Sequence, residues 1–300
     1  MPSRSVGRGR NVSSTFDVST GKAGRRKKRA ESNGVGSLKE VKAVVLAGGR
    51  GARLAPYTTI LPKPLMPVGE RSILEIVVGQ LEKAGIVDIH FCVGYLAHLI
   101  QAVFENRENG HVNITYVYEQ DALGTAAPLR LVEGLDDTFV VMNGDVLTTL
   151  DYRDLVHYHR EQHNALTIAT HKRSIKIDYG LLHLDVASRV REYEEKPEIA
   201  SPVSMGIYVM EPSVVEHIPE DSHFDFPNLV RALLAAGEPV GAYFHDGLWF
   251  DIGRHEDYER ATEAWANGAE EGNLNGDRRS RASKLHSPNG DRRTNGGGAT

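Results

Sequence analysis

The sequence has few of the residues that crosslink a chain or hold it in a membrane. Its 300 residues include one cysteine, Cys92, so no internal disulfide can form, as is typical of proteins in a reducing cytoplasm. Cys92 lies in the apolar run Ile89–Val93, which predicts a buried strand position. No apolar run reaches the ~20 residues of a membrane-spanning helix. The N-terminus also lacks the apolar segment of ~7–15 residues that a signal peptide requires. We therefore expect a cytoplasmic protein with no membrane partner.

Apolar residues are scarce at both ends of the chain. Residues 1–40 are rich in Gly, Ser and Arg and include the basic cluster Arg25–Arg29, and residues 268–300 are rich in Asn, Gly, Arg and Ser. Such segments cannot offset the entropy of ordering, so we predict two disordered tails around one folded domain over 41–267. No aromatic residues interleave the basic cluster, which favours a solubilising tail over a nucleic-acid or membrane tether or a localisation signal.

Helical and strand patterns alternate between the two tails. Short apolar runs predict strands, and apolar residues three and four apart predict helices. The expected strands cover 41–46, 87–93, 114–118 and 138–142, and the expected helices cover 72–83, 97–105, 125–133 and 151–163. This order predicts an α/β fold, with a Rossmann-like, mostly parallel sheet and helices on both faces. Further strands over 165–171, 180–186, 189–194 and 204–210 predict a small antiparallel lobe.

A glycine-rich turn follows the first predicted strand. Gly48, Gly49 and Gly51 let the backbone bend tightly and bring its N–H groups close to an anion. Arg53 adds a planar cation suited to phosphate oxygens, and Lys63 lies between two prolines that restrict its backbone. Leu54 replaces the third glycine of a dinucleotide-binding fingerprint, and a Walker A loop is absent. The turn therefore predicts a polyphosphate site of another kind.

These residues resemble the opening motif of the sugar-phosphate nucleotidyltransferases, and four further segments match that family in order. Gly48–Leu54 (GGRGARL) and Pro62–Pro64 (PKP) resemble the opening motif, with Ala52 in place of the usual small hydroxyl residue. The other four segments resemble the base-binding loop, the strand that ends in a metal-binding aspartate, the sugar-site motifs, and the segment with a second metal-binding aspartate. They are Glu119–Ala126, Phe139–Asp145, Tyr179–Gly180 with Glu195–Pro197, and Trp249–Gly253.

The resemblance implies a role for each matching residue. The catalytic residues would be Arg53, Lys63 and Asp145, and the nucleotide would be bound by Leu46, Ala47, Gly48, Gly49, Gly51, Glu119, Gly124 and Thr125. The sugar phosphate would be bound, in the antiparallel lobe, by Gly144, Tyr179, Gly180, Glu195, Lys196 and Ser204. Asp145 and Asp251 would hold Mg²⁺, a hard cation that prefers oxygen ligands. Arg53 would bind the β- and γ-phosphates, and Lys63 the α-phosphate.

The expected reaction transfers a nucleoside monophosphate from an NTP to a sugar 1-phosphate, releasing pyrophosphate. Glu119 stands where the family reads the base, and a carboxylate only accepts hydrogen bonds, which favours the two donors of guanine. We therefore expect GTP, with mannose 1-phosphate as the default acceptor. Two alternatives are a uridylyl- or thymidylyltransferase acting on glucose 1-phosphate and a non-catalytic NDP-sugar-binding regulatory subunit. The sequence permits a homo-oligomer and gives little support for nucleic-acid binding.

His159 and His163 have the i, i+4 spacing that can chelate zinc on a helix. The adjacent glutamate of an HExxH motif and a third ligand are missing. We therefore expect both side chains to lie on a solvated helix face.

Overall fold

The computed structural model describes residues 38–105, 111–119, 122–220 and 222–266. Most of the two predicted tails, 1–40 and 268–300, lies outside the described residues, as do Gln120 and Asp121 of the base-binding loop. Leu38, which we placed in the N-terminal tail, is 3% exposed and belongs to the hydrophobic core. The N–H of Val41 donates to its carbonyl over 3.0 Å. Folded structure therefore begins before the predicted boundary at residue 40.

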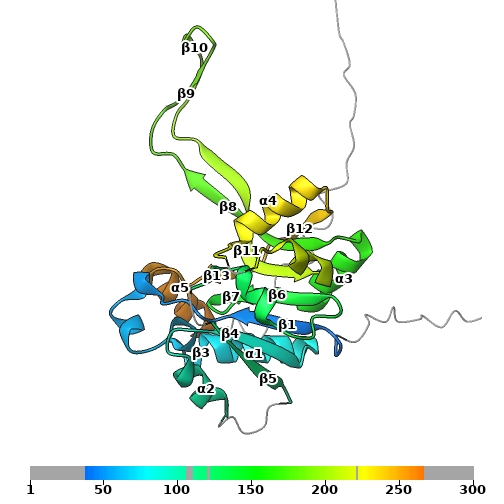
Figure 1. Ribbon diagram of the computed structural model, residues 1–300. Coiled ribbons are helices and arrows are strands. Elements are labelled where there is room, and N and C mark those ends of the chain that lie inside the picture. Colours follow the sequence, from blue (N-terminus) through cyan, green and yellow to red (C-terminus); the bar gives the residue numbers. More distant parts are fainter. Residues whose placement is uncertain (1–37, 106–110, 120–121, 221, 267–300) are drawn as a thin grey trace, which may run out of the picture. The chain divides into compact units, whose positions relative to one another are not determined.

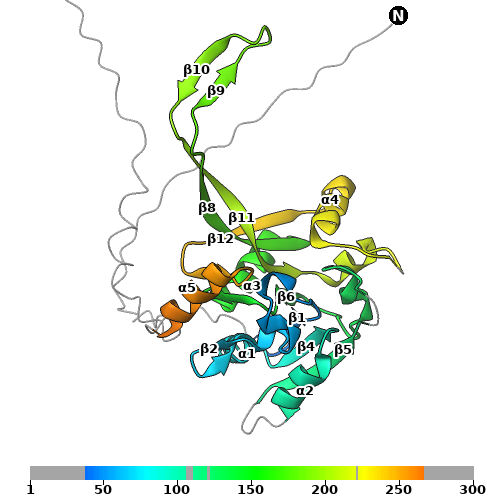
Figure 2. The same cartoon turned by 90° about the vertical axis from the view of Figure 1, so that its left-hand side faces the viewer.

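A seven-stranded sheet forms the centre of the fold, in the order β12-β8-β11-β6-β1-β4-β5 (Figures 1 and 2). Its strands are β1 (Lys42–Leu46), β4 (Asp88–Val93), β5 (Asn113–Tyr118), β6 (Phe139–Asn143), β8 (Leu166–Lys176), β11 (Glu198–Met210) and β12 (Val240–His245). The pairs of β1 with β4 and β6, of β4 with β5, and of β8 with β12 are parallel, and β11 is antiparallel to both of its neighbours. The prediction of a mostly parallel α/β sheet is confirmed.

Alternate residues of the central strands enter two separate cores. In β1, Ala43 and Val45 pack into one core and Val44 into the other, as the two-residue period of a strand requires. The first core is covered by α1 (Ile73–Ala84), α2 (Ala97–Glu105), α3 (Tyr152–Gln162) and α5 (His255–Ala266). The second core is covered by α4 (Phe226–Ala236) and by 3₁₀ turns. Cys92 is fully buried in the second core, as predicted.

Local signals explain where the helices begin. Ser72 and Glu75 form a reciprocal capping box at the start of α1, and the side chain of Asp151 accepts from the N–H of Arg153 at the start of α3. The helix predicted over 125–133 is wrong, because this segment is a 3₁₀ turn over Ala127–Leu131. At the start of this segment, the N–H of Thr125 donates to the side chain of Asp225 and not to a carbonyl of a helical turn.

The predicted small antiparallel lobe is present, but it is joined to the central sheet. Residues 166–171 and 204–210 belong to β8 and β11 of the central sheet, and these strands continue beyond it as a paired ribbon. The ribbon leads to a hairpin of β9 (Leu181–Leu184) and β10 (Val190–Glu194). We call residues 172–203 the arm, and it projects away from the sheet in both views (Figures 1 and 2). The arm is thus an extension of central strands.

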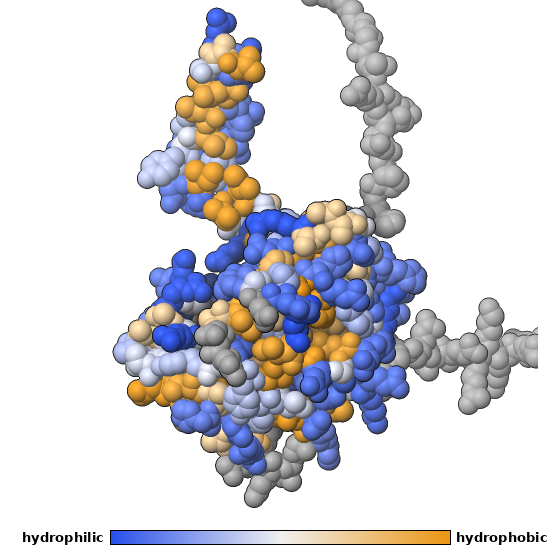
Figure 3. Space-filling view, in the orientation of Figure 1, coloured by the Kyte–Doolittle hydropathy of each residue, from blue (hydrophilic) through white to orange (hydrophobic). Residues whose placement is uncertain are grey.

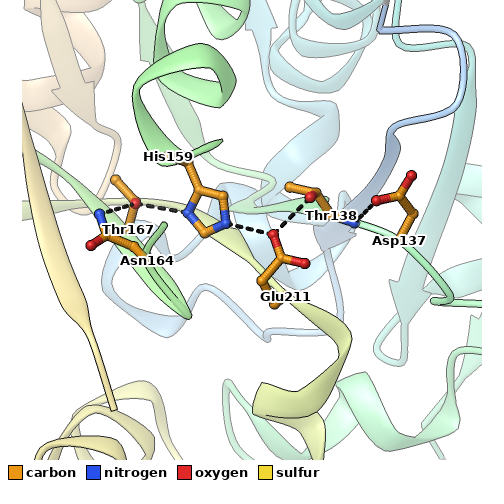
Figure 4. Close-up of polar contacts among 6 residues, drawn as sticks. All are labelled: Asp137, Thr138, His159, Asn164, Thr167 and Glu211. Carbon is orange, nitrogen blue, oxygen red and sulfur yellow. Dashed lines mark hydrogen bonds and ion pairs between the residues drawn. The ribbon is translucent and has the colours of Figure 1, made fainter. Parts of the chain in front are cut away.

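The prediction of a solvated face for both histidines is wrong for His159. Its imidazole is fully buried, with Nδ1 2.8 Å from Thr167 Oγ1 and Nε2 3.0 Å from Glu211 Oε1 (Figure 4). Glu211 also accepts from Thr138 Oγ1 over 2.7 Å, which joins α3, β8 and the ends of β6 and β11. The described residues contain no group of three His, Cys, Asp or Glu side chains arranged to hold a metal ion. His159 is therefore part of a buried polar network.

Candidate nucleotide and metal site

A pocket of about 380 Å³ lies at the carboxyl ends of β1, β5 and β6. Eleven of the residues that we assigned from the sequence line it: Leu46, Ala47, Gly48, Gly49, Gly51, Arg53, Lys63, Glu119, Gly124, Thr125 and Asp145. Pro64, Ala122, Asn143 and His223 complete the lining. The parallel arrangement of the strands explains this convergence, because their carboxyl ends meet at one edge of the sheet. We call this cavity the nucleotide pocket.

Glycines bring the walls of this pocket close together. A Cβ atom added to Gly48 would lie 2.6 Å from Glu119 Oε1, so only glycine allows the carboxyl to approach this loop. Gly51 has φ +61°, a left-handed conformation that favours glycine, and its carbonyl accepts from Thr58 Oγ1 over 2.9 Å. The loop therefore presents its backbone to the pocket without intervening side chains.

Glu119 and Gly124 also line the pocket, with the carboxyl of Glu119 against Gly48. Burial raises the pKa of Glu119 to about 7, and the N–H of Leu123 offsets part of this shift by donating to the carboxyl. Gly124 has φ +93°, and an added Cβ would lie 2.7 Å from the carbonyl oxygen of Phe224. The side chain of Asp225 accepts from the N–H and the hydroxyl of Thr125, over 2.8 and 3.0 Å.

Lys63 and Asp145 form an ion pair at the floor of the pocket. Lys63 is 8% exposed, and it begins a 3₁₀ turn held by the prolines on either side. Asp145 Oδ1 is buried and has no hydrogen-bond partner among the residues that the structure describes, while its other oxygen contacts Lys63. A buried carboxylate oxygen without a partner is costly, which indicates a site built for a further cation.

Asp251 lies beside Asp145 although the two are far apart in the sequence. The short strands β7 (Val146–Thr148) and β13 (Trp249–Asp251) pair antiparallel with Asp251 opposite Val146, and the N–H of Ile252 donates to the carbonyl of Asp145 over 3.2 Å. Asp251 is open to solvent on one side, yet neighbouring atoms desolvate it enough to raise its pKa. The nearby negative charge of Asp145 adds to this rise, and Lys63 and Arg53 oppose it.

This carboxylate pair fits Mg²⁺, which is often held by one or two carboxylates together with substrate phosphates and water. Asp145 has an oxygen without a partner among the described residues, and the pKa of Asp251 is raised in part by the charge of Asp145. A divalent cation between them would remove both penalties.

The remaining assigned residues do not line the nucleotide pocket. Gly144 lies beneath it, where its N–H donates to the carbonyl of Leu46 over 2.9 Å, and an added Cβ would lie 3.0 Å from that oxygen. Ser204 donates to the hydroxyl of Tyr208 over 3.2 Å. The four sugar-motif residues lie on the arm, where Tyr179 is 80% exposed and Lys196 lies 4.0 Å from the carboxylate of Glu195. Gly180 packs against the ring of Tyr193. Their sugar-binding roles stay predictions.

The arm carries apolar side chains on one face. Leu182, Leu184, Val190 and Tyr193 share a face by their pairing in the hairpin, and each is at least half exposed. Figure 3 shows orange, hydrophobic patches along the arm.

Three polar residues that contribute to the nucleotide pocket were not assigned from the sequence. Asn143 and His223 line it, and Asp225 holds Thr125 in place. The sequence signal for Asp225 is its position before Phe226-Pro227, since an aspartate before a proline commonly begins a helix. The position of the Asn143 side chain depends on the lack of a side chain at Gly206, because an added Cβ there would lie 2.6 Å from the Asn143 amide nitrogen. Sequence spacing alone does not reveal that contact.

The chain is similar in sequence and in fold to known proteins. A family model described as nucleotidyl transferase matches residues 42–268. The chain is 32% identical over 241 residues to a UTP–glucose-1-phosphate uridylyltransferase of Synechocystis sp., covering 74% of this chain and 62% of the relative. It is 34% identical over 234 residues to a mannose-1-phosphate guanyltransferase of Yarrowia lipolytica, covering 74% of this chain and 63% of the relative.

A solved structure of a putative glucose-1-phosphate thymidylyltransferase from Bacillus anthracis is similar, with a TM-score of 0.58 and 26% identity. The match covers 74% of this chain and 94% of that one. The chain spans a little under two thirds of the length of the two curated relatives above. None of the helices in the described part of the chain is long and apolar enough to cross a bilayer.

Proposed function

Since the chain belongs to the nucleotidyl transferase family, we propose that it transfers a nucleoside monophosphate from an NTP to a sugar 1-phosphate. The observation that carries this proposal is the arrangement at the floor of the nucleotide pocket. Lys63 pairs with Asp145 beside a glycine loop, and Asp251 adjoins them. A phosphate-binding loop with a buried lysine and two carboxylates suits phosphoryl transfer, which depends on positioning and charge neutralisation.

The incoming nucleophile needs no general base. A sugar 1-phosphate is largely a dianion at neutral pH, because the second pKa of a phosphate monoester is ~6. One of its oxygens would form a bond to the α-phosphorus, and the bond from that phosphorus to the bridging oxygen of the β-phosphate would break. The bond electrons would leave with pyrophosphate. Lys63 would neutralise the charge at the α-phosphate and Arg53 would bind the leaving phosphates, a proposal supported by the presence of both cations in the pocket lining.

Asp145 and Asp251 would hold Mg²⁺ in this proposal. The bound ion would neutralise phosphate charge and help to orient the triphosphate. Lys63 would also hold Asp145 in place through their ion pair.

We propose GTP as the nucleotide because of Glu119. An ionised carboxylate offers two acceptors, which match the adjacent ring N–H and amino group of guanine. The pKa of about 7 places this carboxyl near half ionisation at neutral pH, so its preference for guanine should strengthen as pH rises. The curated relatives include both guanyl- and uridylyltransferases, so UTP or dTTP with glucose 1-phosphate is the second candidate.

Mannose 1-phosphate is the proposed acceptor by analogy with the guanyltransferase relatives. The arm residues Tyr179, Glu195 and Lys196 remain our candidates for contacting the sugar and its phosphate. We also keep the cytoplasm as the proposed location and leave a homo-oligomer open.

The test is pyrophosphate release from the purified protein with Mg²⁺, with GTP, UTP, dTTP, CTP and ATP each paired with mannose 1-phosphate and glucose 1-phosphate. We expect release with GTP. Asp145→Asn should reduce the rate at least about hundredfold, as expected for the loss of an essential electrostatic group. Release only with UTP or dTTP would refute the base assignment and keep the reaction. Nucleotide-dependent thermal stabilisation without turnover in any combination would favour the regulatory subunit.

A further inference from the structure

A second pocket, of about 320 Å³, lies on the other side of Arg53. Three segments form it: the root of the arm, strand β13, and the start of α5. Its lining is His171, Lys172, Arg173, Ser174, Trp249, Phe250, Asp251, Gly253, Arg254, Asp257 and Arg260, together with Arg53. Arg53 is the lining residue that this cavity shares with the nucleotide pocket. We call it the basic pocket.

The charges of the basic pocket are unbalanced. Five of its side chains are cationic and two are carboxylates. Asp257 lies 4.0 Å from Arg260, and Asp251 faces Asp145. Lys172, Arg173 and Arg254 have no side-chain hydrogen bond or ion pair with any residue that the structure describes. Cations gathered around one cavity repel each other and attract anions, so the pocket favours an anionic ligand.

The pocket lies at the start of α5. Gly253 and Arg254 line it just before the helix begins at His255, and Asp257 lines it from the first turn. The N-terminus of a helix carries a partial positive charge and free N–H groups, which Glu256 and Asp257 of this turn offset. The unpaired cations therefore carry the preference for an anion.

We propose that the basic pocket binds the pyrophosphoryl group, with Lys172, Arg173 and Arg254 as phosphate-binding residues beyond Arg53. Before the reaction these residues would bind the β- and γ-phosphates of the triphosphate, and afterwards they would bind the free pyrophosphate. This inference rests on the proposed function, because it extends the donor site of that reaction.

The position of Arg53 supports the path of the triphosphate. An α-phosphate beside Lys63 and Asp145 lies in the nucleotide pocket, and Arg53 connects that pocket to the basic one. A chain of phosphates that passes Arg53 would enter a cavity of cations. The guanidinium of Arg53 is placed by close packing, since an added Cβ on Gly253 would lie 3.4 Å from its Nη1 atom.

The chemistry of the lining favours pyrophosphate over a sugar. Ammonium and guanidinium groups only donate hydrogen bonds, and phosphate oxygens that face them only accept. Sugar hydroxyls both donate and accept, and so would leave several of these cations without an anionic partner. The group that matches most of the lining is therefore a polyanion.

Isothermal titration of the full chain with inorganic pyrophosphate, with and without Mg²⁺, tests this proposal without turnover. We compare wild type with the double variant Lys172→Ala/Arg254→Ala. The matched control, Arg189→Ala/Arg231→Ala, removes two arginines outside both pockets. We expect the Kd for pyrophosphate to rise roughly tenfold in the first variant and less than twofold in the control, because charge-assisted bonds at exposed sites are weakened by solvent. Lys172→Arg/Arg254→Lys should restore most of the affinity.

Steady-state kinetics then identify the substrate that uses the pocket. In the double variant the KM for the NTP should rise and the KM for the sugar 1-phosphate should stay unchanged. A rise confined to the sugar 1-phosphate would overturn the proposal and make this the acceptor site. Unchanged pyrophosphate binding would also overturn it, since the cations would then be merely solvated. If no NTP is turned over but the variant still loses pyrophosphate binding, the proposed function fails and this binding site stands.

Discussion

Replacing Glu119 with glutamine should stabilise the protein at high pH. Glu119 is half-buried beside Gly48, and this burial raises its pKa from 4.5 to about 7. Between these two values the folded protein keeps a proton that the unfolded chain has released. The contribution of Glu119 to stability is therefore highest below pH 4.5 and is lost as pH rises through 7. Glutamine has nearly the same shape and no charge, so it should remove this loss.

The size of the effect follows from the two pKa values. Each unit of difference corresponds to about 1.36 kcal/mol, so ionising Glu119 in the fold costs on the order of 3 kcal/mol at pH 8. At pH 5 the same linkage leaves less than about 1 kcal/mol. Glu119→Gln should therefore gain roughly 3 kcal/mol of unfolding free energy at pH 8 and little at pH 5.

Urea denaturation of the full chain at pH 5 and pH 8 measures this difference. The control is Glu133→Gln, a change of the same kind at an exposed glutamate. A gain for Glu119→Gln that is equal at both pH values would refute the linkage, because it would come from packing or from the unfolded chain. A matching gain in the control would refute the role of burial. If the prediction holds, the base-reading residue lowers the stability of the fold in its ionised form, as expected for a group kept for binding.

Three further predictions concern the same edge of the sheet. Gly48→Ala should weaken GTP binding at least about tenfold in a nucleotide titration, with a small change in melting temperature, because the new methyl group would displace the flexible end of Glu119. Gly124→Ala should lower the free energy of unfolding by roughly 1–3 kcal/mol, because φ +93° strains alanine and the backbone carbonyl of Phe224 cannot move away easily. The lowered pKa of His159 means that its neutral form is favoured in the fold, so wild type should lose more stability than His159→Gln as pH falls through 6.5, in parallel urea titrations.

The parts of the site that could be predicted lie on strands buried on both faces. β1, β4 and β6 are short, largely apolar runs, and a polar residue or glycine lies within two residues of the carboxyl end of each. The order of strands and helices then places those ends together. Asp251 was assigned by family resemblance, since a strand of three residues such as β13 has no detectable period. Its contact with Asp145 depends on the pairing of β13 with β7, which no local pattern specifies.

The arm shows that a strand pattern does not determine whether the apolar face of the strands is covered. The strands predicted over 180–186 and 189–194 are confirmed as β9 and β10, which pair as a hairpin with Leu182, Leu184 and Tyr193 on one face. The strand pattern would turn that face toward a core, and in this chain it is exposed. A two-stranded ribbon has too little apolar area to form a core of its own, so pairing within the hairpin fixes its register and leaves its position to the strands at its root. Those strands, β8 and β11, stay paired as far as Lys176 and Glu198. Their ladder carries Tyr179 and Glu195 away from the nucleotide pocket and leaves Lys172 and Arg173 beside Arg53. A sequence motif can therefore identify which residues belong to a site, while the length of a paired ribbon decides which of them reach it.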